Sequence, residues 1–103
     1  MNTGWRKLTQ DEVEFVPDRA GVYELADAHW RVIYIGIGLP SLHEEMAGYL
    51  DGPGPEGKET AEYFRFEPTP NPSRRYDALL KEYQRKHGGE VPVWNKVEAE
   101  NLK

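Results

Sequence analysis

The chain has no cysteine and no long apolar run, and each absence removes a class of function. Without cysteine there is no disulfide framework and no thiolate that could act as a nucleophile or metal ligand. No stretch approaches the roughly 20 apolar residues of a membrane-spanning helix, and the N-terminal residues lack the apolar segment of a secretory signal. We therefore expect a cytoplasmic protein with no membrane partner.

Several common site motifs are also missing. The three histidines, His29, His43 and His87, do not have the spacing of metal ligands, so a zinc site is not expected. There is no phosphate-binding loop of the Walker type, no dinucleotide fingerprint and no G-x-S-x-G elbow. Any chemistry must therefore come from a less common arrangement of residues.

The composition is that of one small globular domain over residues 1–103. The 103 residues are 38% hydrophobic, 30% charged and 12% aromatic, so aromatic side chains must supply much of the buried area. The net charge of −5 argues against a protein whose whole surface binds nucleic acid, because phosphate binding needs local positive potential.

Two short runs rich in β-branched and aromatic residues, 21–26 and 31–36, predict a pair of antiparallel strands. The four residues between them begin with an aspartate, which suits a hairpin turn. With this loop, Tyr23 of the first strand lies directly opposite Tyr34 of the second. We therefore expect both phenols on one face of the sheet, as a cross-strand pair.

The rest of the sequence predicts an α+β fold, with a small, three-stranded, mostly antiparallel sheet flanked by helices. The alternating run 61–67 supplies the third strand. One helix is expected from the capping residue Ser41 to about residue 50. A longer helix follows the capping residue Asn71 and its proline neighbour, and ends near residue 87.

The remaining segments are expected outside this framework. An N-terminal extension, about 1–19, contains a short helix that begins with a capping box at Thr9. Residues 51–59 alternate glycine and proline, and predict a surface loop. Residues from about 97 to 103 are expected to form a tail or a short final turn.

The tripeptides Gly21-Val22-Tyr23 and Tyr34-Ile35-Gly36 resemble the two signatures of the GIY-YIG superfamily of endonuclease domains. In that family both tripeptides lie on the first two strands of a small antiparallel sheet. A helix with an arginine, a later helix with a metal-binding glutamate, and a terminal asparagine follow in that order. Here residues 41–46, 78–82 and 92–95 take those places, so the resemblance spans most of the chain.

The resemblance implies a metal-dependent endonuclease that acts on phosphodiester bonds. It implies that Tyr23 helps to activate the attacking water, that Tyr34 hydrogen-bonds near the scissile phosphate, and that Asn95 supports the site. It also implies that Glu82 holds Mg²⁺, which a single carboxylate, several waters and substrate oxygens can bind. A neutral phenol is a poor base, so this chemistry needs a cation or a metal close to the tyrosines.

Two positions depart from the family's pattern. His43 falls where the arginine is expected, and Ile37 falls where many members carry a lysine. An imidazole lacks the bidentate fork of a guanidinium, and both changes remove positive charge from the expected phosphate site. His43 is then a different acid or donor, a sign of lost activity, or a helix-surface residue with no role. We expect weak cleavage or none.

Two other candidates also have plainer interpretations. Glu82 and Lys86 stand at positions i and i+4, which is the spacing of an ordinary surface ion pair. Asn95 could bind the loop of the first tripeptide or position Glu82, or it could be an ordinary loop residue after Pro92.

The predicted helix after Asn71 concentrates positive charge within an acidic chain. Its basic residues are candidates for binding nucleic acid, or they form an ordinary solvated face. They are Arg74, Arg75, Lys81, Arg85 and Lys86. The rival to an active nuclease is therefore a catalytically degenerate domain that binds nucleic acid or another protein.

Overall fold

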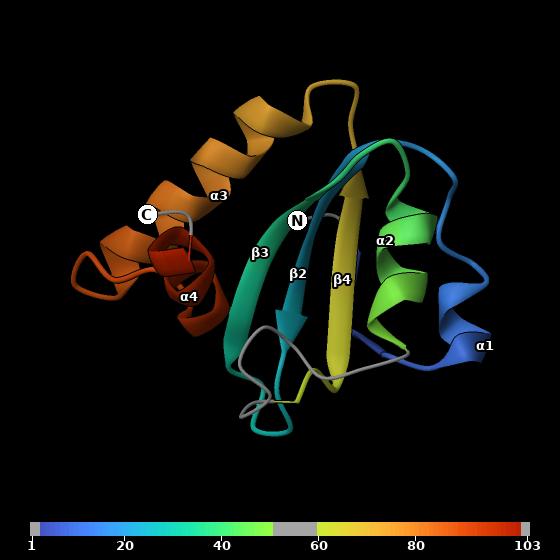
Figure 1. Ribbon diagram of the computed structural model, residues 1–103, viewed down its shortest axis with the longest axis horizontal. Coiled ribbons are helices and arrows are strands. Elements are labelled where there is room, and N and C mark those ends of the chain that lie inside the picture. The colour runs from blue at the N-terminus through green and yellow to red at the C-terminus, as the bar shows by residue number, and fades with distance from the viewer. Residues whose placement is uncertain (1–2, 51–59, 102–103) are drawn as a thin grey trace.

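The computed structural model describes residues 3–50 and 60–101, and it confirms the α+β class. An antiparallel sheet lies between helices α1 and α2 on one side and α3 on the other, and α4 lies beside the edge strand β3 (Figure 1). The strands are β1 (Arg6–Lys7), β2 (Gly21–Ala26), β3 (Val32–Gly38) and β4 (Tyr63–Pro68). The helices are α1 (Gln10–Val13), α2 (Leu42–Tyr49), α3 (Pro72–Lys86) and α4 (Val93–Asn101). The predicted loop 51–59 lies outside the described residues.

The sheet has four strands rather than the three expected. Its order is β1-β4-β2-β3, and the added strand pairs Arg6 with Phe64 and Lys7 with Tyr63. A two-residue strand leaves no alternating pattern in the sequence, so only its pairing with β4 reveals it. Part of the predicted N-terminal extension therefore belongs to the sheet.

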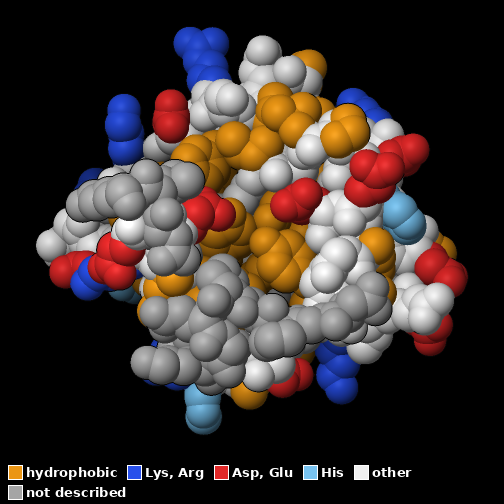
Figure 2. All heavy atoms as spheres, viewed as in Figure 1, with side chains coloured by type: hydrophobic (Ala, Val, Ile, Leu, Met, Phe, Trp, Pro, Cys, Tyr) orange, Lys and Arg blue, Asp and Glu red, His pale blue; other side chains and the backbone are white. Residues whose placement is uncertain are grey.

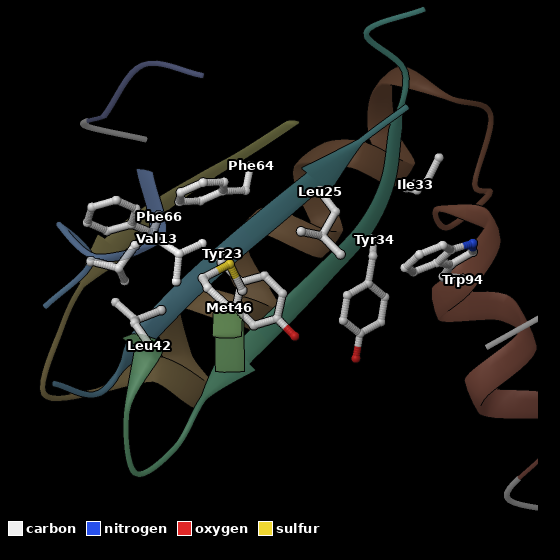
Figure 3. Packing of buried hydrophobic residues seen from close by; sticks show 11 residues of the cluster. Val13, Tyr23, Leu25, Ile33, Tyr34, Leu42, Met46, Phe64, Phe66 and Trp94 are labelled. Atoms are coloured by element: carbon white, nitrogen blue, oxygen red, sulfur yellow. The ribbon is translucent and has the colours of Figure 1, made fainter. Parts of the chain in front are cut away.

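The two faces of the sheet are covered by different helices. Alternation along the strands sends Tyr23, Leu25, Phe64 and Phe66 to the side where Leu42 and Met46 of α2 complete the larger core (Figure 3). We call this side the tyrosine face. Val22 and Ile35 lie on the opposite side, where they pack against Leu79 of α3. We call this side the α3 face.

The predicted register of the hairpin is wrong by two residues, because Tyr23 pairs with Gly36. One residue of the shift comes from the loop, where the Asp27 amide donates to the Arg31 carbonyl at 3.0 Å and leaves only three residues in the turn. The other comes from a bulge near the end of β2. A register shift of one residue would place the Tyr34 side chain on the α3 face, whereas a shift of two residues keeps it on the same face as Tyr23. The predicted shared face of the tyrosines is therefore confirmed.

Side chains form hydrogen bonds with free backbone groups along both edges of the sheet. On the outer edge of β4, Thr3 Oγ1 accepts from the Phe66 amide at 3.0 Å and donates to the Phe66 carbonyl at 2.5 Å. On the outer edge of β3, Asn95 Oδ1 accepts from the Ile35 amide at 2.9 Å, and Asn95 Nδ2 donates to the Ile35 carbonyl at 2.8 Å. These bonds satisfy edge groups that would otherwise be free to pair with another strand.

The three predicted helix starts are confirmed, although the Asn71 side chain makes no capping hydrogen bond, and a fourth helix was not predicted. Thr9 Oγ1 accepts from the Glu12 amide at 3.4 Å, and Ser41 Oγ accepts from the Glu44 amide at 3.2 Å. Helix α4 runs through residues 97–101, where a tail was expected, because Val97 is buried. Within the described ranges, no helix has the length and apolar character needed to cross a membrane.

Candidate functional site

Tyr23 and Tyr34 come together on the tyrosine face, as the sequence predicts. Their ring centroids are 5.9 Å apart, and both hydroxyls point in the same direction (Figure 3). Gly36 makes this arrangement possible, because a Cβ there would lie 2.5 Å from the Tyr23 hydroxyl and 2.6 Å from the Tyr34 ring. The final glycine of the second tripeptide therefore leaves space for the tyrosine of the first.

The two phenols share a cluster with three residues that sequence reasoning did not select. The Tyr23 hydroxyl lies 2.8 Å from the Tyr49 hydroxyl and 3.2 Å from Glu45 Oε1, both on α2. The Tyr34 hydroxyl donates to Glu98 Oε2 of α4 at 2.8 Å. We call these five residues the tyrosine–glutamate cluster. The i, i+4 spacing of Glu45 and Tyr49 was a signal that they share one helix face.

The environment of the cluster keeps its phenols protonated. Burial, together with neighbouring tyrosine and glutamate groups, raises the pKa of Tyr23 and of Tyr34. Burial also raises the pKa of Tyr49 to about 12, although its hydrogen bond with Tyr23 acts in the opposite direction. A neutral phenol donates a hydrogen bond but is a poor base. At neutral pH Tyr23 and Tyr34 are therefore protonated and can donate to Glu45 and Glu98.

No Lys or Arg side chain of the described residues pairs with the carboxylates of the cluster. Neither Glu45 nor Glu98 forms an ion pair with a Lys or Arg of the described residues. In the face seen in Figure 2, hydrophobic and acidic side chains occupy the middle, and Lys and Arg side chains lie toward the margins. An incoming phosphate would therefore meet two carboxylates without a compensating cation from these partners.

The structure does not bring His43 to the tyrosines. Its Nδ1 lies 3.2 Å from the Val16 carbonyl oxygen, and the side chain lines a groove between α1 and α2. The α2 side chains that reach Tyr23 are Glu45 and Tyr49. Glu45 is two positions after His43, and residues two apart point to different sides of a helix. A carboxylate therefore stands where a phosphate-binding cation would be needed.

Glu82 is also separated from the tyrosines. It lines a groove on the α3 face together with Glu24 and Arg65, and its side chain is 52% exposed. Lys86 Nζ lies 3.3 Å from Glu82 Oε1, so the surface ion pair is confirmed. The hydrogen bond and positive charge of Lys86 lower the pKa of Glu82. An exposed, paired carboxylate on this face does not fit a magnesium ion held beside the tyrosines.

Asn95 lies on α4 rather than in a closing loop. Its amide is committed to Ile35 at the edge of β3, and Nδ2 also lies 3.4 Å from the Tyr76 hydroxyl. Asn95 is buried and carries these bonds inside the protein. It therefore positions the strand that holds Tyr34, which is a structural task. Nearby, Trp94 is also buried, and its Nε1 has no hydrogen-bond partner within residues 3–50 and 60–101.

The five basic candidates on α3 separate into two groups. Arg75 binds Glu67 through Nε at 2.8 Å and through an Nη at 3.2 Å, and Lys86 pairs with Glu82. The other three residues are exposed and stand at positions i, i+7 and i+11, which places them on one side of the helix. We call them the basic stripe: Arg74, Lys81 and Arg85.

Comparison with known families gives one match. A family model described as Domain of unknown function (DUF7508) matches residues 1–86. The chain belongs to the DUF7508 family. The DUF7508 match includes both tripeptides, α2 and α3, while α4 with Asn95 and Glu98 follows it. Among curated proteins, none matches the chain.

Within residues 3–50 and 60–101 of this DUF7508 protein, no group of three or more His, Asp or Glu side chains is placed to hold a metal ion. The described carboxylates that face the tyrosines are two, Glu45 and Glu98.

Proposed function

We propose that this DUF7508 protein binds nucleic acid through helix α3, and that it is a divergent, non-cutting relative of the GIY-YIG endonucleases. The relationship is supported by the two tripeptides on paired antiparallel strands, with Gly36 beneath Tyr23. The observation that carries the binding proposal is the basic stripe on the outer side of α3.

The distribution of charge supports α3 as the binding element. The helix holds five of the 13 Lys and Arg residues of the chain and two of its 18 Asp and Glu residues. In a protein of net charge −5, this makes α3 a local region of positive potential. Arg74, Lys81 and Arg85 are exposed along one side of the helix and are available to phosphates.

The cluster around Tyr23 supports binding without cutting. A nuclease must stabilise the charge that develops on the phosphate, and a missing donor commonly costs about 10²–10³ in rate. Here the α2 side chains that face Tyr23 are Glu45 and Tyr49, neither of which is a cation, and the raised pKa of Tyr23 makes its phenol a poor base. His43 and Glu82 contribute nothing at this point, because they lie elsewhere.

We expect charge reversal along the basic stripe to abolish binding. The triple variant Arg74→Glu, Lys81→Glu and Arg85→Glu should lower affinity for DNA or RNA on the order of 100-fold, and native binding should weaken steeply with salt because phosphate contacts release counterions. Fluorescence anisotropy with labelled single- and double-stranded oligonucleotides at several salt concentrations measures both effects.

A matched variant separates this effect from net charge. Lys7, Arg19 and Lys96 are exposed cations outside α3, and their reversal to glutamate changes the net charge by the same amount. This control should bind within a few-fold of the native chain. Equal losses in both triple variants, or native affinity that does not depend on salt, would contradict binding through α3. Absence of binding to every nucleic acid would favour a protein partner.

A metal-dependent endonuclease is the second candidate, favoured by the convergence of Tyr23 and Tyr34. We expect the native chain to leave labelled DNA and RNA intact in Mg²⁺ or Mn²⁺. His43→Arg should not change this, because its side chain faces α1. Gel assays of single-turnover reactions provide the measurement. Cleavage by the native chain that is lost in both Tyr34→Phe and Glu82→Ala would show that a working nuclease site exists.

A further inference from the structure

A groove of about 540 Å³ lies on the α3 face, between the β2–β3 hairpin and the last turns of α3. This volume is within the range of small-molecule sites. Its walls come from β2, the hairpin loop, β4 and α3, so segments distant in the sequence meet there. The groove is on the opposite side of the sheet from the tyrosine–glutamate cluster.

Trp30 stands at the rim of this groove in an unusual backbone conformation. Its φ is +65°, a left-handed value that glycine or asparagine adopts more easily and that costs about 1–2 kcal/mol for other residues. One side of the indole stacks on Tyr63 at 3.7 Å between centroids, and Trp5 meets it edge-on at 6.5 Å. Trp30 is nevertheless 55% exposed. The loop therefore holds a rigid aromatic surface toward solvent at a cost in strain.

A buried ion pair supplies directional polar groups to the same groove. Glu24 is nine-tenths buried, and its Oε1 accepts from Arg65 Nε at 2.5 Å. Its second oxygen, Oε2, has no hydrogen-bond partner among the described residues, which leaves an acceptor that the groove can use. The Arg65 guanidinium lies 4.4 Å from the centre of the Trp5 ring, and this contact fixes its plane.

The charges around the groove are paired with one another. Arg31, Arg65 and Lys86 line it, and they form ion pairs with Asp27, Glu24 and Glu82. Arg31 and Lys86 are exposed, and each keeps N–H groups beyond the one in its ion pair. An aromatic ligand with a phosphate would therefore meet a stacking surface and two cationic donors at the rim.

We propose that this groove binds one unpaired nucleotide of a single strand, with guanine preferred. The base stacks on the open side of Trp30, as unpaired bases do on aromatic side chains. Its Watson–Crick edge presents one acceptor beside two N–H donors, which matches Arg65 beside the carboxylate of Glu24. Arg31 and Lys86 lie at the position of the neighbouring phosphates. This inference rests on the proposed nucleic-acid binding, and it names the ligand and its second contact surface.

The test compares two single-stranded probes, an oligothymidine octamer and the same octamer with one central guanine. The native chain should bind the guanine probe about 10-fold more tightly, since good base-edge pairing gives roughly 5- to 150-fold discrimination. Replacing the guanine with hypoxanthine, which lacks the exocyclic amino group, should remove most of that preference. This measurement needs no variant of the protein.

Two variants locate the preference in the groove. Trp30→Gly suits the left-handed backbone and should lower affinity for both probes about 10-fold through lost stacking. Glu24→Gln should bring the guanine probe down to the affinity of the thymidine probe and leave the latter unchanged. Phe15→Gly is the matched control, because Phe15 is 75% exposed outside the groove, and it should change neither affinity.

Failure of the groove proposal and failure of binding through α3 would give different results. If the charge reversal on α3 abolishes binding but Trp30→Gly and Glu24→Gln bind both probes as the native chain does, the groove proposal is wrong and binding through α3 stands. Equal native affinity for the guanine, hypoxanthine and thymidine probes also overturns it. If the native chain binds no oligonucleotide, both proposals fail.

Discussion

Unfolding at alkaline pH is the largest effect that we expect. Burial raises the pKa values of Tyr23 and Tyr34 above the ordinary value of 10.0, and it raises that of Tyr49 to about 12. A raised pKa stabilises the folded state fully below pH 10, and this contribution is lost as the pH rises toward the folded value. Between pH 10 and 12 each tyrosine should remove about 1.4 kcal/mol per pH unit, or about 4 kcal/mol per unit for the three.

A loss at this rate should unfold a small domain in this pH range, because the total free energy of unfolding of such a domain is usually only about 5–15 kcal/mol. Denaturant unfolding followed by circular dichroism at a series of pH values measures it. The variant Tyr49→Phe lacks one ionisable phenol and should show a slope smaller by about 1.4 kcal/mol per pH unit. Stability that stays constant from pH 10 to 12 would show that the cluster tyrosines ionise in the folded protein.

Gly36→Ala should cause the largest loss of stability from a one-atom change. The new Cβ would lie 2.5 Å from Tyr23 Cζ and 2.6 Å from Tyr34 Cε2. Tyr23 is 1% exposed and is packed by its neighbours, so its ring cannot yield without disturbing the core. We expect a loss of about 3 kcal/mol, at the upper end of the usual cost of overpacking. Urea denaturation at neutral pH gives the value.

Gly48→Ala is the control for this substitution. Gly48 lies in α2 and is exposed, and a Cβ added there would have no heavy atom of the described residues within 4 Å, apart from its own stretch of helix. The same one-carbon addition should therefore raise stability by about 0.5–1 kcal/mol, because alanine favours a helix more than glycine does. If Gly36→Ala matches the native protein or the control, then the tyrosine ring does not lie across Gly36 as described.

Much of the fold could be predicted because its signals are local. The strands 21–26 and 61–67 were visible as alternating or β-rich runs, and the capping residues Thr9 and Ser41 marked the helices that follow them. The strand β1 and the helix α4 were not visible. Two polar residues carry no periodic pattern, and the burial of Val97 depends on where α4 is packed.

The candidate site was predicted less well, because it depends on helix rotation and on the faces of the sheet. The tyrosines were correctly placed on one face, although the register was wrong by two residues. Glu82 was assigned beside them from its order in the chain, but α3 packs on the other face. Glu45 and Glu98 reach the phenols from helices whose rotation only packing defines.

The sequence by itself determined the α+β class, the placement of Tyr23 and Tyr34 on one face of the sheet, and the concentration of positive charge on α3. Each of these follows from residue type and from periods of two or 3.6 residues, which do not depend on distant contacts. Tertiary structure decided which carboxylates meet the phenols, which glycine admits a ring, and where Trp30 and Glu24 form a groove. These features depend on contacts between residues far apart in the chain, and only packing brings those residues together.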